Sequence, residues 1–261
     1  MVLMHSFLLL ISNESMSDVS FDNPFYDEMA KYPARFAAPV LFGDPPASSY
    51  SASLRNGTAT LLTLKDRFLA VTCQHLLDSY RKAQATTNTF FQLAHVAMNP
   101  NDFLVDEDRD LDLAVLDLTS FVGKAPYLTE ANFISPILWP PQPVTTNDVL
   151  CLAGFPGIWR DQVELGHVRF YSYSSGASEV TSVNENKIVT RVNIQDCVTQ
   201  INHGKVFGFL GGLSGGPVFA WRKTPVLVAE LVGFIYEYQE SLDLMFVRSA
   251  AVIREDGRLA L

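Results

Sequence analysis

The stretch Gly211–Phe219 reads G-G-L-S-G-G-P-V-F and is the most informative part of the chain. Glycines on both sides of Ser214 allow the backbone to turn tightly, so that backbone N–H groups can point into one small space. A serine hydroxyl is a weak nucleophile, which needs an adjacent base and hydrogen-bond donors for the oxyanion that forms on attack. The apolar run Val218–Trp221 predicts a strand that anchors this loop. The alternative interpretation is a glycine-rich hairpin with an incidental serine.

Two further segments offer a base and an acid for this serine. The segment Phe68–His75 reads F-L-A-V-T-C-Q-H, an apolar strand that ends in a histidine. A lone histidine there would be interpreted as a core residue, as we do for the other four histidines. Asp112 opens the apolar strand D-L-A-V-L, where it can orient a histidine and stabilise the imidazolium. Asp110 lies two residues earlier on the same strand face and is the second candidate for the acid.

These three segments resemble motifs of the trypsin-like (chymotrypsin-fold) serine peptidases, over about residues 50–250. Ser214 in G-L-S-G-G-P matches the G-x-S-G-G-P nucleophile loop, and the chain order His75, Asp112, Ser214 is that of chymotrypsin. The segment 152–157, L-A-G-F-P-G, is similar to a turn of disulfide-free bacterial members, including the HtrA type. No PDZ-like segment follows the matched region.

The resemblance implies an all-β fold of two six-stranded antiparallel β-barrels, with the active site in the cleft between them. It implies a serine endopeptidase that needs no cofactor and no metal. Ser214 would attack the peptide carbonyl, His75 would transfer the proton, and Asp112 would orient His75. The backbone N–H groups of Gly212 and Ser214 would form the oxyanion hole.

The chain departs from the digestive and clotting-type members of the family at Leu213. Those members have an aspartate there, which pairs with a newly cleaved N-terminus, so that activation mechanism is not available here. By alignment, the substrate side-chain pocket would include Gly208, Phe209, Tyr236 and Tyr238. Gly208 replaces the acidic residue that selects Arg or Lys, so we expect a preference for a small or apolar residue.

The rest of the chain favours the same fold class. Short apolar runs alternate with turn residues, which is typical of an all-β sandwich or barrel. Expected strands are Gly57–Leu64, Phe68–Thr72, Phe90–Met98, Leu113–Leu118, Val149–Gly154, Lys187–Ile194, Pro217–Trp221, Val226–Ile235 and Leu244–Val247. Helical spacing is confined to Leu76–Ala85 and Arg248–Arg254.

The chain divides into three parts in this interpretation. Residues 1–36 are polar and aromatic and form an N-terminal arm. The proline-rich run Trp139–Pro143 cannot be a central strand and serves as a linker. We therefore expect a first barrel at 37–139 and a second barrel with a C-terminal segment at 140–261.

Composition limits the partners and the compartment. The 261 residues carry a net charge of −9, which argues against a general nucleic-acid binder. No run of consecutive apolar residues reaches about 18, so we expect no membrane-spanning helix. Three cysteines are an odd, sparse set, so we expect buried thiols in a reducing, cytoplasmic compartment. The apolar start Met1–Ile11 lacks the flanking features of a signal peptide, and Met16 is a second candidate start.

Two alternatives to an active peptidase remain open. One is a binding module on a protease fold, because fold alone does not establish activity. The other is a latent peptidase that a regulatory protein partner, or the arm at residues 1–36, switches by acting on the loops around Ser214. In each case the expected partner is a protein or peptide.

Overall fold

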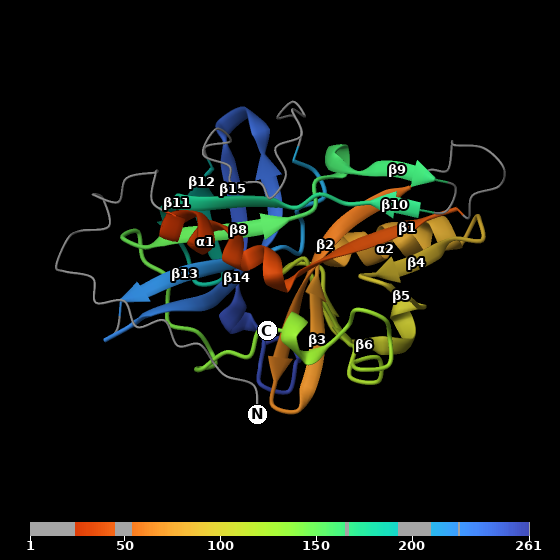
Figure 1. Cartoon of the computed structure of the whole chain (residues 1–261), viewed down its shortest axis with the longest axis horizontal. Coiled ribbons are helices and arrows are strands. Elements are labelled where there is room, and N and C mark those ends of the chain that lie inside the picture. The colour runs from red at the N-terminus through yellow and green to blue at the C-terminus, as the bar shows by residue number, and fades with distance from the viewer. Residues whose placement is uncertain (1–23, 45–53, 165–166, 193–209, 224, 261) are drawn as a thin grey trace.

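The computed structural model describes residues 24–44, 54–164, 167–192, 210–223 and 225–260 (Figure 1). Two β-structures lie side by side, the first built from the N-terminal half and the second from the C-terminal half. This arrangement confirms the expected all-β, two-barrel class.

The first β-structure is a curled, seven-stranded antiparallel sheet with the strand order β5-β4-β1-β2-β3-β7-β6. Its edge strand β5 is only two residues long, and the chain leaves it through a 3-10 turn. Among the described residues, β5 and β6 are the two edges of this sheet and do not pair with each other. Its strands are β1 (Ala37–Gly43), β2 (Arg55–Leu64), β3 (Arg67–Thr72), β4 (Phe90–Leu93), β5 (Val96–Ala97), β6 (Leu104–Asp108) and β7 (Leu113–Asp117).

The second β-structure is a closed barrel with the order β11-β12-β15-β14-β13-β8. Closure leaves no free edge in this barrel. A two-stranded ribbon, β9–β10, lies outside it. The strands are β8 (Val149–Gly154), β9 (Asp161–Glu164), β10 (His167–Arg169), β11 (Tyr173–Val183), β12 (Lys187–Arg191), β13 (Pro217–Lys223), β14 (Leu227–Gln239) and β15 (Leu244–Ser249).

Helices are few and short in the described part of the chain. The α-helices are α1 (Pro24–Lys31) and α2 (Gln74–Gln84), and α2 begins within two residues of the expected segment. The 3-10 helices are η2 (Tyr32–Phe36), η3 (Pro100–Phe103), η4 (Glu130–Asn132), η5 (Gly157–Trp159), η7 (Glu240–Leu242) and η8 (Ala250–Val252). The helix expected at Arg248–Arg254 is wrong: the segment is the end of β15 followed by η8. The backbone of Arg248 and Ser249 pairs in the barrel, and Val252 and Ile253 are buried between the two β-structures.

Three apolar clusters hold the fold together. One lies within the curled first sheet, one fills the closed barrel, and the third lies between the two β-structures. The third cluster contains Leu69 of β3, Phe219 of β13 and Val252 of η8, so burial of these side chains fixes one β-structure against the other. The described part of the arm joins this packing, because Tyr32 contacts the rings of Phe219 and Trp221 edge-on.

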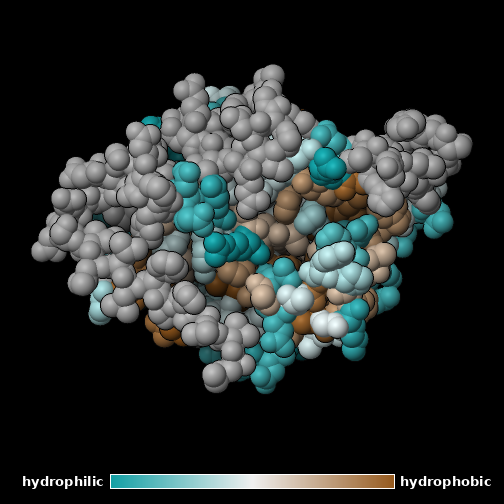
Figure 2. All heavy atoms as spheres, in the orientation of Figure 1, coloured by the Kyte–Doolittle hydropathy of each residue, from teal (hydrophilic) through white to brown (hydrophobic). Residues whose placement is uncertain are grey.

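The surface shown in Figure 2 has hydrophobic residues grouped near the middle of the described area, between hydrophilic side chains. In the described residues, no helix combines the length and the hydropathy that crossing a membrane would take.

Candidate active site

His75 is placed where a buried strand becomes a helix. Strand β3 ends at Thr72, Cys73 adopts an extended conformation as the N-cap, and α2 begins at Gln74. Leu77 and Tyr80 anchor α2 in the core of the first sheet. His75 is left at the first turn of the helix with 48% of its side chain exposed. The imidazole is thus held on a rigid element and remains open to solvent.

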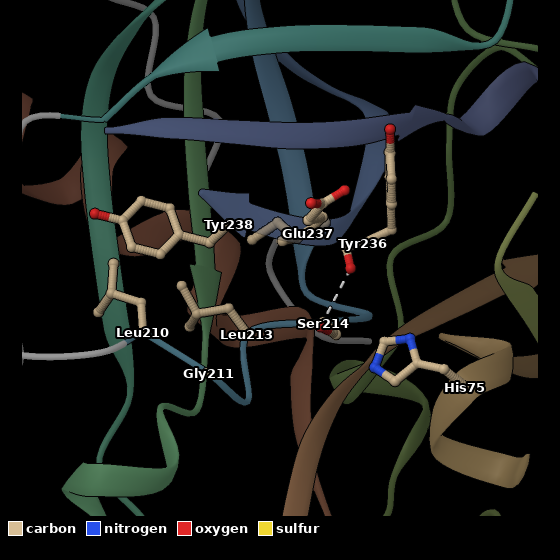
Figure 3. A pocket seen from close by; sticks show the side chains of 9 residues that line it. His75, Leu210, Gly211, Leu213, Ser214, Tyr236, Glu237 and Tyr238 are labelled. Carbon is tan, nitrogen blue, oxygen red and sulfur yellow. Dashed lines mark hydrogen bonds between the residues drawn. The ribbon is translucent and has the colours of Figure 1, made fainter. Parts of the chain in front are cut away.

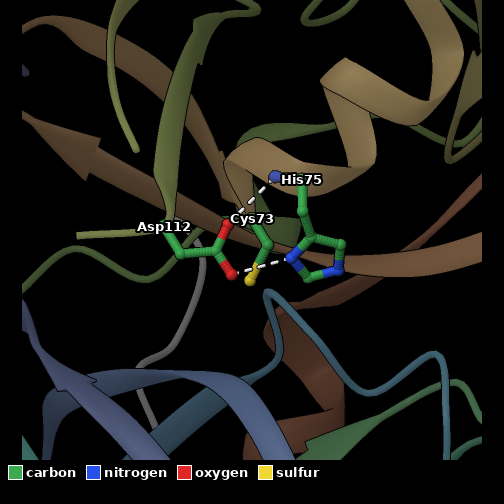
Figure 4. A group of neighbouring side chains, drawn as sticks. All are labelled: Cys73, His75 and Asp112. Carbon is green, nitrogen blue, oxygen red and sulfur yellow. Dashed lines mark hydrogen bonds and ion pairs between the residues drawn. The ribbon is translucent and has the colours of Figure 1, made fainter. Parts of the chain in front are cut away.

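Asp112 binds His75 through both of its carboxylate oxygens. Oδ2 lies 2.7 Å from Nδ1 of the ring, and Oδ1 accepts the backbone N–H of His75 at 2.9 Å (Figure 4). A carboxylate is an acceptor, so Nδ1 carries the proton, and in the neutral imidazole Nε2 is left as an acceptor. This is the arrangement that general-base catalysis by histidine requires. Asp110, the second candidate for the acid, is exposed, and the expectation that it shares a strand face with Asp112 is wrong, because both residues lie in the turn before β7.

Cys73 completes a group of three metal-ligating residue types, but the group does not fit a metal ion. Its Sγ and the ligand atoms of His75 and Asp112 all lie within 4.8 Å of one another. Two ligands of a tetrahedral zinc ion lie roughly 3.3 Å apart when the metal–ligand bonds are ~2.0–2.1 Å. The 2.7 Å between Nδ1 and Oδ2 is therefore a hydrogen bond and too short for shared coordination. The thiol donates to the Ile235 carbonyl at 3.4 Å, and burial raises its pKa well above the ordinary value.

Ser214 lies opposite His75, on the other β-structure. The two residues border the same pocket, and Figure 3 shows Ser214 between Leu213 and the imidazole. The hydroxyl donates to the backbone carbonyl of Tyr236 at 3.4 Å. Among the described contacts, no hydrogen bond joins Ser214 to His75. The structure therefore brings together the three residues that the motifs predict, with the serine hydroxyl turned toward β14.

The peptide before Gly212 has a fixed direction. The Gly211 carbonyl accepts the N–H of Gly157 at 2.7 Å. A trans peptide is planar, so the Gly212 N–H points the opposite way. Gly212 has φ +106, and a Cβ on it would lie 2.7 Å from both Asn56 Nδ2 and the Phe155 carbonyl, which explains why glycine is needed.

The peptide before Ser214 is fixed in the same manner. The Leu213 carbonyl accepts the N–H of Gly216 at 2.8 Å, so the Ser214 N–H points away from that contact. Within the described residues, neither the Gly212 N–H nor the Ser214 N–H donates to an acceptor. Two unpaired backbone donors thus lie beside the serine.

Strand β2 of the first sheet holds this loop, through residues that the sequence analysis did not identify. Thr58 Oγ1 donates to the Gly212 carbonyl at 2.8 Å, and the Thr58 N–H donates to the Ser214 carbonyl at 3.0 Å. Thr60 Oγ1 donates to the Gly215 carbonyl at 2.8 Å. Both threonines are buried. The available signal was the alternation of Thr58 and Thr60 about Ala59, which places the two hydroxyls on one face of the strand.

The pocket beside Ser214 has a volume of about 190 Å³ and is mostly apolar. Its walls include Leu210, Leu213, Ile235 and the two tyrosines predicted to line it, Tyr236 and Tyr238. The other two predicted pocket residues, Gly208 and Phe209, lie outside the described residues.

One wall of the pocket is fixed by a hydrogen bond to an acidic group. Tyr238 donates its hydroxyl proton to Asp243 Oδ1 at 3.3 Å. Burial, followed by Asp243, raises the pKa of Tyr238 to about 12. The Tyr238 side chain is therefore a neutral wall of the pocket.

Comparisons with known proteins found similar chains among solved structures. No protein-family model and no curated protein matches the sequence. Among solved structures, the chain is similar to a serine endoprotease from Yersinia pestis, with 17% identity, a TM-score of 0.49 and 88% of this chain covered. The match covers 64% of the Yersinia chain, so this chain spans less than two thirds of that protein.

Two further solved structures are also similar. The Rv3671c protease from M. tuberculosis, in its active form, has 14% identity, a TM-score of 0.43, and 94% and 90% of the two chains covered. The thermostable serine protease AL20 from an extremophilic microorganism has 14% identity, a TM-score of 0.42, and 82% and 91% covered. The strand topology confirms the expected fold class: a curled sheet and a closed six-stranded barrel make up a two-barrel, chymotrypsin-like fold.

Proposed function

We propose that this protein is a serine endopeptidase with Ser214 as nucleophile, His75 as general base and Asp112 as the residue that orients His75. The observation that carries the proposal is the paired contact between Asp112 and His75 beside the pocket that Ser214 borders. The two carboxylate contacts fix both the ring and its backbone. They leave Nε2 as the atom that can accept a proton.

The reaction follows from these positions. A rotation about the Cα–Cβ bond of Ser214 would move its hydroxyl from the Tyr236 carbonyl toward His75. Oγ would then attack the peptide carbonyl while Nε2 takes its proton, and the imidazolium would give that proton to the leaving amine. Water would attack the acyl-enzyme in the second half of the cycle, with His75 again as base. Asp112 would stabilise the imidazolium without itself being protonated.

The N–H groups of Gly212 and Ser214 are our candidates for the oxyanion hole. Supporting this role, the carbonyl of each preceding residue is held elsewhere by a hydrogen bond, and both N–H groups are unpaired among the described residues. Donors of this kind stabilise the charge on the tetrahedral intermediate, and losing one costs about 10²–10³-fold in kcat. Leu213 is buried in the barrel core, which supports a loop that folds without a cleaved N-terminus.

We infer a substrate that places a small or apolar side chain in the pocket. The leucine, isoleucine and tyrosine side chains that line it offer no buried carboxylate to an Arg or Lys side chain, since Glu237 is exposed at its border. Burying an unpaired charge there would be costly. Cleavage of a peptide library should be dominated by small or apolar residues before the scissile bond, and a profile dominated by Arg and Lys would contradict this inference.

A second candidate is a latent or inactive protease-fold module that binds a protein or peptide. It is favoured by one observation: the Ser214 hydroxyl donates to the Tyr236 carbonyl in place of His75. In this case a protein partner, or the arm at residues 1–36, would reorient the serine. Deletion of residues 1–23 tests the arm, because the deletion keeps the buried Met29 and Phe36. An unchanged rate after deletion would exclude residues 1–23 as the switch.

Labelling with a fluorophosphonate, measured by intact mass, separates the two candidates. A working nucleophile, base and oxyanion hole would give one adduct on the natural protein. The matched control is Ser214→Ala, which should give none. A folded natural protein that gives no adduct would contradict the peptidase proposal and support the latent or binding module.

A further inference from the structure

Arg248 belongs to the second β-structure and forms hydrogen bonds to the first β-structure beside the candidate acid, Asp112. It lies on β15, and its guanidinium donates from Nε to the Leu111 carbonyl at 2.8 Å and from Nη2 to the Asp110 carbonyl at 3.0 Å. These are the two carbonyls immediately before Asp112. A planar guanidinium holds such a pair of acceptors in a fixed relation, which a single ammonium nitrogen cannot do.

The turn to which Arg248 binds has an unfavourable backbone conformation at Asp112, where φ is +53. Residues with a Cβ seldom adopt this left-handed region, and aspartate does so more often than most, so surrounding contacts help to hold it. The turn supplies two such contacts, Asp112 N–H to the Arg109 carbonyl at 3.3 Å and Leu111 N–H to Asp108 Oδ1 at 2.7 Å. Arg248 adds the two contacts that come from the other β-structure.

The guanidinium also lies over the ring of Tyr236, a residue that borders the pocket. Cζ of Arg248 lies 4.8 Å from the centre of the Tyr236 ring, a cation–π distance. Tyr236 borders the pocket, and its carbonyl accepts the hydroxyl of Ser214. One side chain therefore links the turn before Asp112 to the strand segment that contacts Ser214. Among the described residues, Arg248 forms no ion pair, so no carboxylate competes for its donors.

We propose that Arg248 is a positioning residue that sets the place of Asp112, and through it the orientation of His75, relative to Ser214. The proposal rests on the serine peptidase function proposed above. Since His75 and Ser214 lie on different β-structures, their alignment depends on contacts that cross between them. Arg248 makes such a contact at the acid, as Thr58 does at the serine loop.

The test uses Arg248→Met and Arg248→Lys in the full chain, with Arg67→Met as the matched control. Arg67 is also a partly exposed arginine with several hydrogen bonds, two to Asp117 and one to the Asp256 carbonyl, and it contacts neither Ser214 nor His75. Because misplacement of a catalytic group by about 1 Å can cost 10²-fold, we expect kcat of Arg248→Met to fall by about 10–10²-fold. KM should change by less than about threefold, because a ground-state contact is not removed.

A second readout needs no substrate. The Nδ1–H proton of His75 can be observed by proton NMR, and it reports the hydrogen bond to Asp112 directly. We expect this signal in the natural protein and in Arg67→Met, and a shifted or broadened signal in Arg248→Met. Arg248→Lys keeps the charge and much of the bulk, so it should fold, yet its kcat should fall and its NMR signal should shift or broaden as in Arg248→Met.

The outcomes decide the proposal. A natural-like NMR signal in both Arg248 variants would overturn it, whatever the activity. So would full rescue of kcat by lysine, or an equal loss of kcat in Arg67→Met. If the natural protein hydrolyses no peptide, the function proposal fails, but the NMR comparison still supports or overturns the role of Arg248.

Discussion

Replacing Thr58 by Val is the most direct test of how the serine loop is held. Thr58 is fully buried, and its hydroxyl donates to the Gly212 carbonyl at 2.8 Å and accepts the Phe155 N–H at 2.9 Å. Valine fills nearly the same space but leaves both backbone groups without this partner. An unpaired buried polar group costs about 1–3 kcal/mol, so the free energy of unfolding should fall by at least ~2 kcal/mol.

Urea unfolding measures that loss, and fluorophosphonate labelling of Ser214 measures the effect on the site. Release of the Gly212 carbonyl frees the neighbouring peptides, so labelling should slow by about 10–10²-fold. The control is Thr58→Ser, which keeps the hydroxyl and loses one methyl group, at about 1 kcal/mol. If Thr58→Val unfolds within about 0.5 kcal/mol of the natural protein and labels at its rate, the hydroxyl does not hold the loop.

Three further predictions concern titratable residues. Asp112→Asn should lower turnover by about 10⁴-fold with the fold intact, measured with a peptide substrate, whereas Asp110→Asn should cost less than about tenfold; the reverse order would exchange their roles. Burial raises the pKa of Tyr238 to about 12 from 10.0, so the folded state keeps this proton longer and stability should fall as pH rises through that interval. Urea midpoints of Tyr238→Phe should lack that part of the decline, and an unchanged slope would contradict the assignment. For Asp148, burial favours the protonated form, but a backbone N–H and Arg222 hold its pKa below 3.8. That stabilisation is present above about pH 4 and is lost as pH falls through the lowered pKa, so Asp148→Asn should be less stable at neutral pH and decline less in acid.

The strands that the sequence predicts are those with continuous apolar runs bounded by turn residues. Val149–Gly154 forms β8 with the expected bounds. Strand β1 was not predicted because Pro39 lies inside it, and proline lacks a ladder donor. Pro39 is tolerated because pairing with β4 begins only at Val40.

Strands with polar sequences were missed for a different reason. Strand β11 contains Ser174, Ser175 and Ser178, residues typical of turns, yet all three are buried. They lie around a bulge in the pairing with β8, where Ala177 has φ +55. The small serine side chains and the bulge allow this segment to be buried in the barrel, although its hydropathy does not predict a strand. Strand β6, with the sequence L-V-D-E-D, is an edge strand, where charged side chains are common, so it lacks the apolar run that predicts a strand.

The residues of the candidate site also divide into those that the sequence predicts and those that it does not. His75, Asp112 and Ser214 lie in short motifs whose spacing and neighbours are visible along the chain. The residues that support them, Thr58 and Arg248, are far from their partners in sequence. No local pattern predicts that Thr58 donates to Gly212 or that Arg248 reaches the turn before Asp112, since such contacts arise only when the two β-structures pack.

One residue of the nucleophile motif, Gly215, lies where the two β-structures pack against each other. Gly215 has φ +92, and a Cβ on it would lie 2.0 Å from the carbonyl oxygen of Thr58, well inside the contact distance of real atoms. The Gly215 N–H donates to the Ile235 carbonyl at 2.7 Å, and its carbonyl accepts the Thr60 hydroxyl. The residue after the nucleophile is therefore compressed between β2 of one β-structure and β14 of the other. A side chain there would separate the two structures, and with them His75 from Ser214, so glycine is required by the assembly of the site as well as by the turn.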